Sequence, residues 1–306
     1  MASNIATTPA TMRQESPFDL SHNEAYRRWR DGKLADYPAR VDDFVIEVGD
    51  PRDLTPAERG ALLARCRKTN MAIYASNVYD ADKNILRQLG RQFGLLRLDQ
   101  NMLADDDGIT RVTVADDSAD VTRRYIPYTN RRLNWHTDGY YNSPVRRIQA
   151  MLLHCVCDGI SGGENAFMDH EIAYLLLRDE NPEYVRALMR PDAMTIPARE
   201  DDDGVARGVQ SGPVFSIDPQ SGALHMRYTA RTRSVEWRQD ASTQAAAARL
   251  LQLLNTDSAY VFRAAFKPGM GILSNNVLHD RAGYSDDATH RRLLYRARFL
   301  DRISSS

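Results

Sequence analysis

Three side chains of this sequence could bind one metal ion together. His136 and Asp138 lie two residues apart in the segment NWHTDGYYN, and residues two apart on a strand project from the same face. A third candidate, His279, ends the apolar run GILSNNVLH. Two imidazoles and one carboxylate on one side of an ion leave the opposite positions open, as in non-haem Fe(II) oxygenases. A closed four-ligand zinc site would leave no such room.

The His-x-Asp spacing alone is a weak signal, because it occurs by chance in many chains. The plain alternative for His136 and Asp138 is a solvated strand edge. Only a second histidine brought to the same place by the fold would turn the pair into a metal site.

A row of arginines follows His279 in the segment HRRLLYRARF. On a strand, Arg292, Arg296 and Arg298 share one face. Three guanidinium groups facing one way are costly unless an anion pairs with them, and a dicarboxylate co-substrate or an acidic substrate would do so. An exposed edge strand that uses charge against aggregation is, for this row alone, an equally good interpretation.

The chain around these residues predicts a mixed fold that is mainly β after residue 109. Strands are expected at 43–48, 71–76, 109–115, 147–157, 164–169, 213–218, 223–228, 259–266, 271–279 and 291–300. Helices are expected at 55–68, 83–94, 170–179, 182–190 and 242–254, the first with Thr55 as cap and Glu58 three residues later. Short strands joined by tight turns indicate an α+β protein with a sandwich or jelly-roll core and flanking helices.

Composition excludes several classes of protein. The 306 residues carry 40 Lys+Arg against 41 Asp+Glu, so no basic surface for nucleic acid is expected. No apolar run approaches the ~20 residues that span a bilayer. Three cysteines do not make a disulfide framework, and we expect a cytoplasmic protein. Residues 1–16 are expected to form a flexible tail, and residues 17–306 a single domain.

Taken together, these motifs resemble the taurine dioxygenase-like family of Fe(II)/2-oxoglutarate oxygenases, which includes clavaminate synthase-like and γ-butyrobetaine hydroxylase-like members. The resemblance spans roughly residues 40–300 and includes NWHTD, SGGENAF, PVFSIDPQSGALHMRY, LSNNVLHDR and RRLLYR, in that order. It implies a double-stranded β-helix core with His136, Asp138 and His279 as iron ligands. It also implies that Arg292 holds the distal carboxylate of 2-oxoglutarate, with Arg296 facing substrate or sharing the co-substrate.

Two departures from the family pattern affect the co-substrate site. Asn165 stands where such enzymes commonly place a threonine, and its amide could donate the same hydrogen bond to 2-oxoglutarate. The interval from His279 to Arg292 is also two residues longer than in taurine dioxygenase, which leaves Arg291 as an alternative to Arg292. Sharing a strand face with Arg296 favours Arg292.

The resemblance implies hydroxylation, or hydroxylation and cleavage, of a small anionic or zwitterionic metabolite. The reaction would use Fe(II) and O2 and would convert 2-oxoglutarate to succinate and CO2. The arginine-rich end of the motif also resembles the glutarate hydroxylase branch, whose substrate is a small dicarboxylate. Substrate contacts are expected from Tyr140, Arg281, Arg296 and Arg298. The substrate itself and the choice between hydroxylation, desaturation and cleavage stay open, and the family implies a dimer or tetramer.

Two other functions are compatible with parts of the sequence. Gly159 to Gly163 matches the G-x-S-x-G motif of serine hydrolases, with Ser161 as nucleophile and His290 downstream. That motif needs a helix directly after the serine, whereas the following ENAFMD predicts a strand. A catalytically silent jelly-roll binding protein is the remaining alternative, and the intact triad of candidate ligands argues against it.

Overall fold

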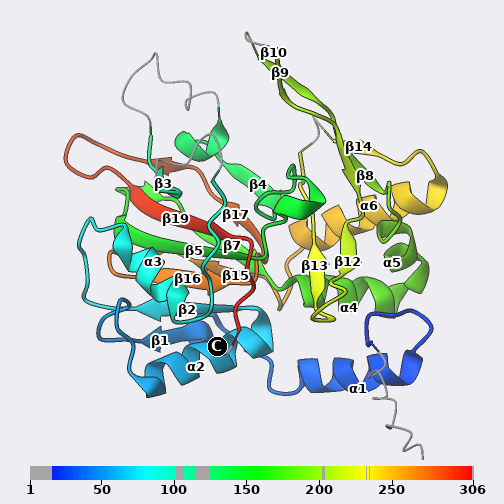
Figure 1. Ribbon diagram of the computed structural model, residues 1–306, viewed down its shortest axis with the longest axis horizontal. Coiled ribbons are helices and arrows are strands. Elements are labelled where there is room, and N and C mark those ends of the chain that lie inside the picture. The colour runs from blue at the N-terminus through cyan, green and yellow to red at the C-terminus, as the bar shows by residue number, and fades with distance from the viewer. Residues whose placement is uncertain are drawn as a thin grey trace, which may run out of the picture.

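The computed structural model describes residues 16–100, 107–114, 125–201, 204–231, 233 and 235–304. The expected N-terminal tail therefore lies outside the described residues, apart from residue 16. Two β-sheets lie at the centre of the molecule, and helices cover their outer sides (Figure 1).

The larger sheet has six strands, and most of its neighbouring strands are far apart in sequence. Its order is β1 (Val45–Glu47), β2 (Met71–Ala75), β16 (Gly271–Ser274), β5 (Ala150–Cys157), β19 (Leu293–Phe299) and β3 (Ile109–Val112). The smaller sheet has four strands in the order β15 (Phe262–Ala264), β7 (Asn165–Met168), β17 (Leu278–Arg281) and β4 (Leu133–His136). Apart from the parallel pair β1–β2, all of these pairings are antiparallel.

Alternating side chains give each sheet an inner and an outer face. On β5, Met151 and Leu153 belong to a buried cluster that also contains Phe167 of β7 and Phe262 of β15, so this cluster lies between the two sheets. Leu152, between them in sequence, belongs to the cluster on the opposite face. This period of two is what the strand pattern predicts.

Helices complete the layers on both sides. Against the larger sheet, α2 (Pro56–Thr69) contacts β2, and α3 (Asn84–Arg91) contacts β5 and β19. Beyond the smaller sheet, α4 (His170–Glu180), α5 (Pro182–Leu188) and α6 (Ala241–Asn255) contact one another and share a buried cluster with residues of β7 and β17. The remaining helix, α1 (Asn23–Leu34), lies below them in Figure 1.

The start of α2 confirms the cap expected from the sequence. The Thr55 hydroxyl accepts a hydrogen bond from the Glu58 amide at 3.3 Å, and the Glu58 carboxylate accepts one from the Thr55 amide at 2.7 Å. Pro56 occupies the first helical position, where its missing N–H costs nothing. Local chemistry therefore fixes this helix boundary.

The run GILSNNVLH was expected to be one strand, and that expectation is wrong. β16 ends at Ser274 in the larger sheet, and β17 begins at Leu278 in the smaller one. Between them Asn276 adopts a left-handed backbone with φ of 54°, which asparagine tolerates better than most residues. The chain thus crosses from one sheet to the other immediately before it delivers His279.

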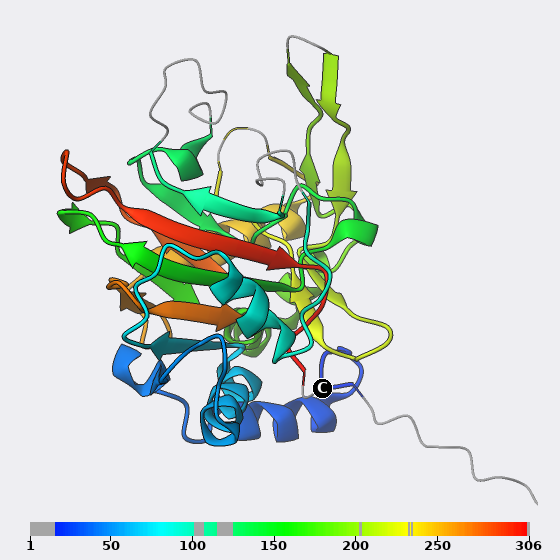
Figure 2. The same ribbon diagram turned by 60° about the vertical axis from the view of Figure 1, so that its left-hand side comes forward.

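Shorter elements surround the two sheets. Two hairpins are formed by β12 (Phe215–Ile217) with β13 (Leu224–Met226) and by β9 (Arg199–Asp201) with β10 (Gly204–Arg207). Two further small sheets consist of β6 (Ser161–Gly162) with β18 (Tyr284–Ser285), and of β11 (Gln210–Gly212), β8 (Met194–Ile196) and β14 (Glu236–Trp237). The 3-10 turns are η1 (Val41–Phe44), η3 (Ile126–Tyr128) and η4 (Pro144–Arg146). The β9–β10 hairpin projects from the body of the molecule in both views (Figures 1 and 2). Within the described residues no helix is both long and apolar enough to cross a membrane.

Removing one large side chain between the sheets should test this packing. Phe167 is 1% exposed and lies 5.8 Å from Phe266, centroid to centroid. We expect Phe167→Ala to lower the free energy of unfolding by about 3–5 kcal/mol, because it leaves a cavity. Asp240→Ala, which removes the cap of α6, should cost only about 0.5–2 kcal/mol. Urea unfolding of both variants measures the difference, and equal losses would contradict the assignment of Phe167 to the core.

Candidate metal centre

The two candidate histidine ligands face each other across a pair of antiparallel strands. β4 and β17 are paired with His136 directly opposite His279, and the two imidazole centroids are 4.2 Å apart. Opposite residues of an antiparallel pair have Cβ atoms about 4.5–5.5 Å apart, so the register alone brings both rings to one place. Both side chains are buried.

Backbone carbonyls orient both imidazole rings. Nδ1 of His136 lies 2.9 Å from the carbonyl oxygen of Asn134, and Nδ1 of His279 lies 3.0 Å from that of Val277. Because a carbonyl oxygen only accepts, each Nδ1 carries the proton and each Nε2 keeps a free lone pair. Burial and the neighbouring His279 lower the pKa of His136 to about 3, so its ring is neutral near pH 7. Metal ligation needs this form.

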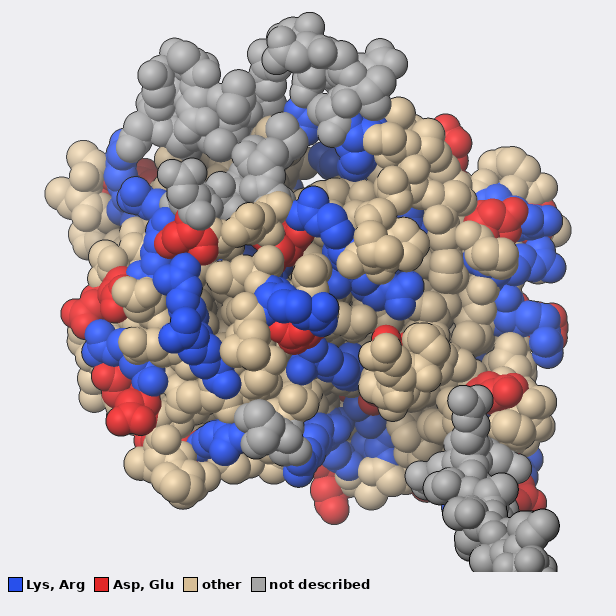
Figure 3. All heavy atoms as spheres, viewed as in Figure 1, with Lys and Arg blue, Asp and Glu red and all other residues tan. Residues whose placement is uncertain are grey.

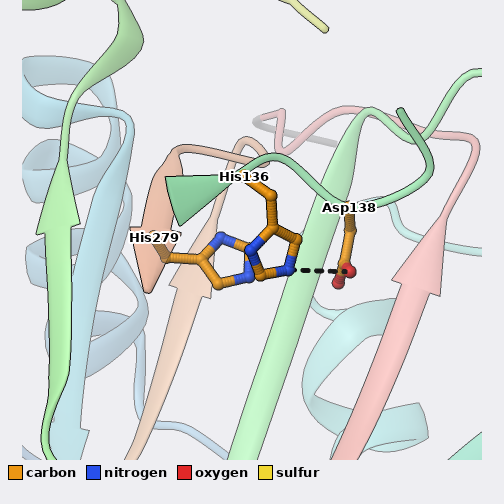
Figure 4. Close-up of side chains that lie close together, drawn as sticks. All are labelled: His136, Asp138 and His279. Carbon is orange, nitrogen blue, oxygen red and sulfur yellow. Dashed lines mark ion pairs between the residues drawn. The ribbon is translucent and has the colours of Figure 1, made fainter. Parts of the chain in front are cut away.

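Asp138 reaches the same place from the turn after β4. Its Oδ1 lies 3.9 Å from Nε2 of His136, and the candidate ligand atoms of His136, Asp138 and His279 all lie within 4.8 Å of one another (Figure 4). Gly139 follows with φ of 67°, where a Cβ atom would come within 2.4 Å of Ile148. Since bonds from a metal to imidazole or carboxylate measure about 2.0–2.2 Å, small side-chain rotations would let these atoms surround one ion.

Asp138 is held in its charged form. Burial alone would raise its pKa, but the positive charges of Arg296 and Arg298 hold the pKa below its usual value. The Arg296 guanidinium lies 3.3 Å from Asp138 Oδ1. Oδ2 of Asp138 is buried and has no hydrogen-bond partner among the described residues. A buried anionic oxygen without a donor is suited to ligate a cation.

Asn276 connects the turn of Asp138 to the strand of His279. Its side-chain oxygen accepts from the Asp138 amide at 2.8 Å, and its side-chain nitrogen donates to the carbonyls of Asp138 at 3.0 Å and Ile148 at 2.9 Å. The sequence alone did not mark Asn276 as a residue of the site. Its position three residues before His279 is a weak signal, and these partners become visible only in the fold.

A cavity beside His279 contains most of the residues expected to bind the co-substrate. Its polar lining includes Asn165, His279, Arg281, Arg292 and Arg296, and its apolar lining includes Met151, Leu153 and Leu294. The structure therefore brings polar side chains of β7 and β17 in the smaller sheet together with Arg292 and with Arg296 of β19 in the larger one.

Arg292 enters this cavity, whereas Arg291 is exposed. The Arg292 guanidinium lies 5.0 Å from the centroid of Tyr284, and its Nη2 is 3.4 Å from the Gly163 carbonyl. Its Nη1 is buried without a hydrogen-bond partner in the part of the chain that the structure describes. Asn165 also donates to the Gly163 carbonyl, at 3.4 Å.

Two of the arginines expected at the substrate already have protein partners. Arg298 pairs with Asp99 at 2.7 Å and donates to the Tyr141 hydroxyl at 2.9 Å, and it is absent from the cavity lining. Arg281 lines the cavity but donates to backbone carbonyls of residues 126, 127, 129 and 131. Burial lowers the pKa of Arg281 to about 10. Sequence reasoning missed Asp99, which no local pattern marks.

Tyr140 borders the metal centre, as expected, although a turn rather than a strand places it there. Its ring meets that of His136 edge-on at 6.5 Å between centroids. Together with Asp138, Tyr140 also lines a second cavity, whose wall includes Ser211, His225 and Arg227.

The surroundings of Ser161 lack the feature that a serine hydrolase needs. Ser161 is exposed on β6, which pairs with β18. The following residues 165–168 form strand β7, as the sequence predicted, in place of the helix of a nucleophile elbow. The hydrolase interpretation therefore has no structural support.

Comparison with known proteins agrees with this geometry. Residues 38–298 match the model of the taurine catabolism dioxygenase TauD, TfdA family. The chain belongs to this family. The TauD, TfdA family match covers the candidate ligands His136, Asp138 and His279, and it also covers the arginine row from residue 292 to residue 298. It thus includes all the candidate ligands of the metal and of the co-substrate.

Individual relatives are more distant. A uridine-5'-phosphate dioxygenase from Amycolatopsis sp is 29% identical over 172 residues, which cover 55% of this chain and 60% of that protein. The match thus covers less than two thirds of the length of this curated relative.

Solved structures resemble the chain in fold. A taurine dioxygenase from Burkholderia xenovorans aligns with TM-score 0.54 and 15% identity, over 84% of this chain and 87% of that one. An asparagine oxygenase in complex with Fe(II), 3-hydroxyasparagine and succinate aligns with TM-score 0.57 and 16% identity, over 95% and 88%. At these identities the likeness concerns the fold.

Loss of the Asn276 side chain should weaken metal binding. We expect Asn276→Ala to raise the dissociation constant for Fe(II) by about 10- to 100-fold, because residues that orient the ligands commonly contribute this much. Anaerobic titration calorimetry with Fe(II) measures the effect. Asn255→Ala, at the exposed end of α6, is the matched control and should bind like the parent protein. Equal affinities in a folded Asn276→Ala variant would show that Asn276 does not position Asp138.

Proposed function

We propose that the protein is an Fe(II)/2-oxoglutarate-dependent dioxygenase that hydroxylates, or hydroxylates and cleaves, a small anionic or zwitterionic metabolite. The observation that carries the proposal is the convergence of three buried ligand atoms beside a cavity containing an unpaired arginine nitrogen. Family membership supports the same reaction class.

His136, Asp138 and His279 would hold the iron. The two free Nε2 atoms, the ionised carboxylate and its unpartnered Oδ2 suit a divalent ion with open positions. Iron bound there would supply the activation of O2, coupled to decarboxylation of 2-oxoglutarate to succinate and CO2 and to oxidation of a C–H bond. The protein contributes the orientation of the ligands and the exclusion of water from their buried side.

Arg292 would hold the distal carboxylate of 2-oxoglutarate inside the cavity. Its buried, unpartnered Nη1 points to an anion, and a bidentate guanidinium–carboxylate pair would satisfy it. Asn165 would donate to the same co-substrate, since its amide lies in the same lining. Arg296 stands between this cavity and Asp138, so it would keep the carboxylate ligand charged and contact co-substrate or substrate.

The substrate would approach past Tyr140, with Arg281 and Arg296 adding positive charge, whereas the expected contact from Arg298 is already paired with Asp99. An excess of guanidinium groups near the metal centre supports an anionic substrate. The name of the Amycolatopsis relative, a uridine-5'-phosphate dioxygenase, is compatible with this charge. We also propose that the two sheets form a double-stranded β-helix within a single domain of residues 17–306, and that the protein forms a dimer or tetramer.

Removal of one ligand should abolish turnover and leave the fold intact. We expect His136→Ala to lose detectable Fe(II)-dependent formation of succinate, because two remaining ligands do not hold the ion. His290→Ala is the control: this exposed histidine belongs only to the hydrolase interpretation and should not affect succinate formation. Unchanged succinate formation in His136→Ala would refute the metal assignment.

Substitution of the adjacent arginines should decide which one binds the co-substrate. Because a hydrogen bond to a charged group contributes about 1.5–3 kcal/mol, we expect Arg292→Gln to raise the KM for 2-oxoglutarate by about 10- to 100-fold. Arg291→Gln, one residue earlier and exposed, should leave this KM near the parent value. The measurement is succinate release at varied 2-oxoglutarate, and the reverse pattern would assign the role to Arg291.

A further inference from the structure

Two arginines face each other at the base of the projecting β9–β10 hairpin. Arg199 begins β9 and Arg207 ends β10, and the two are paired directly across the strands. Like charges directly opposite on neighbouring strands destabilise a hairpin. Arg231, after β13, adds a third positive charge to the electrostatic surroundings of Arg207. Such a concentration of charge calls for an anion.

The contacts of these three arginines are neutral. Arg199 lies 4.4 Å from the centroid of Tyr125 and contacts its hydroxyl. Arg231 donates to the Tyr140 hydroxyl at 3.2 Å, and Arg207 lies 5.5 Å from the centroid of Tyr141. Within the described part of the chain, none of the three arginines forms an ion pair with a carboxylate.

Neighbouring arginines of the same region behave differently. Figure 3 shows Lys and Arg side chains mixed with Asp and Glu over this face, so exposed positive charge by itself marks no site. The arginines on and around α5 and α6 do have carboxylate partners, namely Arg186 with Glu183, Arg190 with Asp240, Arg238 with Asp192 and Arg249 with Glu180. Arg199, Arg207 and Arg231, which we call the arginine cluster, have no such partner among the described residues, and neither does Arg227, whose bonds go to backbone carbonyls.

The arginine cluster adjoins the metal centre through two tyrosines. The rings of Tyr140 and Tyr141 are 5.1 Å apart, and Tyr140 lies 6.5 Å from His136 between ring centroids. Tyr140 also lines the second cavity together with Asp138, so that cavity extends from a metal ligand to a side chain that Arg231 contacts. The three arginines do not line this cavity, but Arg207 and Arg231 contact the two tyrosines that separate them from the metal centre.

Electrostatics at Arg207 favour an anionic ligand. Burial lowers the pKa of Arg207. The neighbouring Tyr140 and Tyr141 oppose this change, whereas the charges of Arg199 and Arg231 lower the pKa of Arg207 further. Nε of Arg207 is buried and lacks a hydrogen-bond partner among the described residues. A bound anion would remove the mutual repulsion and accept from this nitrogen.

We propose that the arginine cluster binds the phosphate group of a phosphomonoester substrate. The inference rests on the proposed function and names the class of its substrate. A phosphate monoester carries about −1.5 to −2 charges at pH 7 and offers three acceptor oxygens, which matches three guanidinium groups better than one carboxylate does. Arg296 is a weaker candidate for this group, because it already pairs with Asp138.

Equilibrium binding of small probes to metal-free protein tests the proposal. The probes are phenyl phosphate, benzenesulfonate, benzoate and inorganic phosphate, measured by titration calorimetry after treatment with a chelator. We expect phenyl phosphate to bind at least 10-fold more tightly than benzoate and benzenesulfonate. If inorganic phosphate binds more weakly than phenyl phosphate, the ligand is a phosphate ester. If inorganic phosphate binds more tightly than phenyl phosphate, the ligand is free phosphate and the substrate assignment is overturned.

Variants locate the binding site. Arg207→Gln and, separately, Arg231→Gln should each weaken binding of phenyl phosphate by about 10-fold or more, since each loses a charged hydrogen bond. Arg231 is exposed, so its variant remains informative if Arg207→Gln fails to fold. Arg91→Gln removes the same charge from α3 on the outer side of the larger sheet and should bind normally.

The outcomes separate this inference from the proposed function. Unchanged binding in both cluster variants, or no preference for phenyl phosphate over benzoate, would overturn the inference even if Fe(II)-dependent succinate formation is found. If phosphate binding depends on Arg207 and Arg231 but the protein never forms succinate, the phosphate site at the arginine cluster is supported and the dioxygenase assignment is refuted. Because chelated protein carries no iron, direct coordination of phosphate by the metal does not contribute to either result.

Discussion

The metal centre depends on the register between β4 and β17. With His136 opposite His279, two imidazoles from positions 143 residues apart in the chain meet inside the molecule. A slip of one residue would turn His279 to the opposite face of its sheet and remove it from the centre. Asn276 strengthens this register at its end, because it bonds to the backbone on both sides of the Asp138 turn. The position of the third candidate ligand, Asp138, is therefore fixed by the same strand pairing.

The inner faces of the two sheets combine two environments. Met151, Leu153 and Phe167 form an apolar cluster between the sheets, while Arg292 and Arg296 extend the same inner face toward the metal centre. The apolar part holds the sheets together, and the charged part is stabilised by acceptors that include the carboxylate of Asp138. Within β19 the period of two places Leu294, Arg296 and Arg298 on one face, so this strand face serves both packing and binding.

The sequence predicted those features that local chemistry determines. The capping box of Thr55 and Glu58, the period of two along β5 and the shared face of Arg296 and Arg298 depend on neighbouring residues, and the structure contains each of them. The shared strand face assumed for His136 and Asp138 was only half correct, since β4 ends at His136. The partner of Arg298, Asp99, is 199 residues away, and only the closed fold brings the two together.

The unpartnered Nη1 of Arg292 has a consequence for the lifetime of the protein. A buried cationic nitrogen without an acceptor disfavours the folded state, and the keto acid proposed to pair with it would stabilise that state by mass action. Resistance to thermal inactivation and to proteolysis is therefore expected to follow the concentration of this acid. The steady-state amount of folded protein would then follow the concentration of this ligand, without any change in its synthesis.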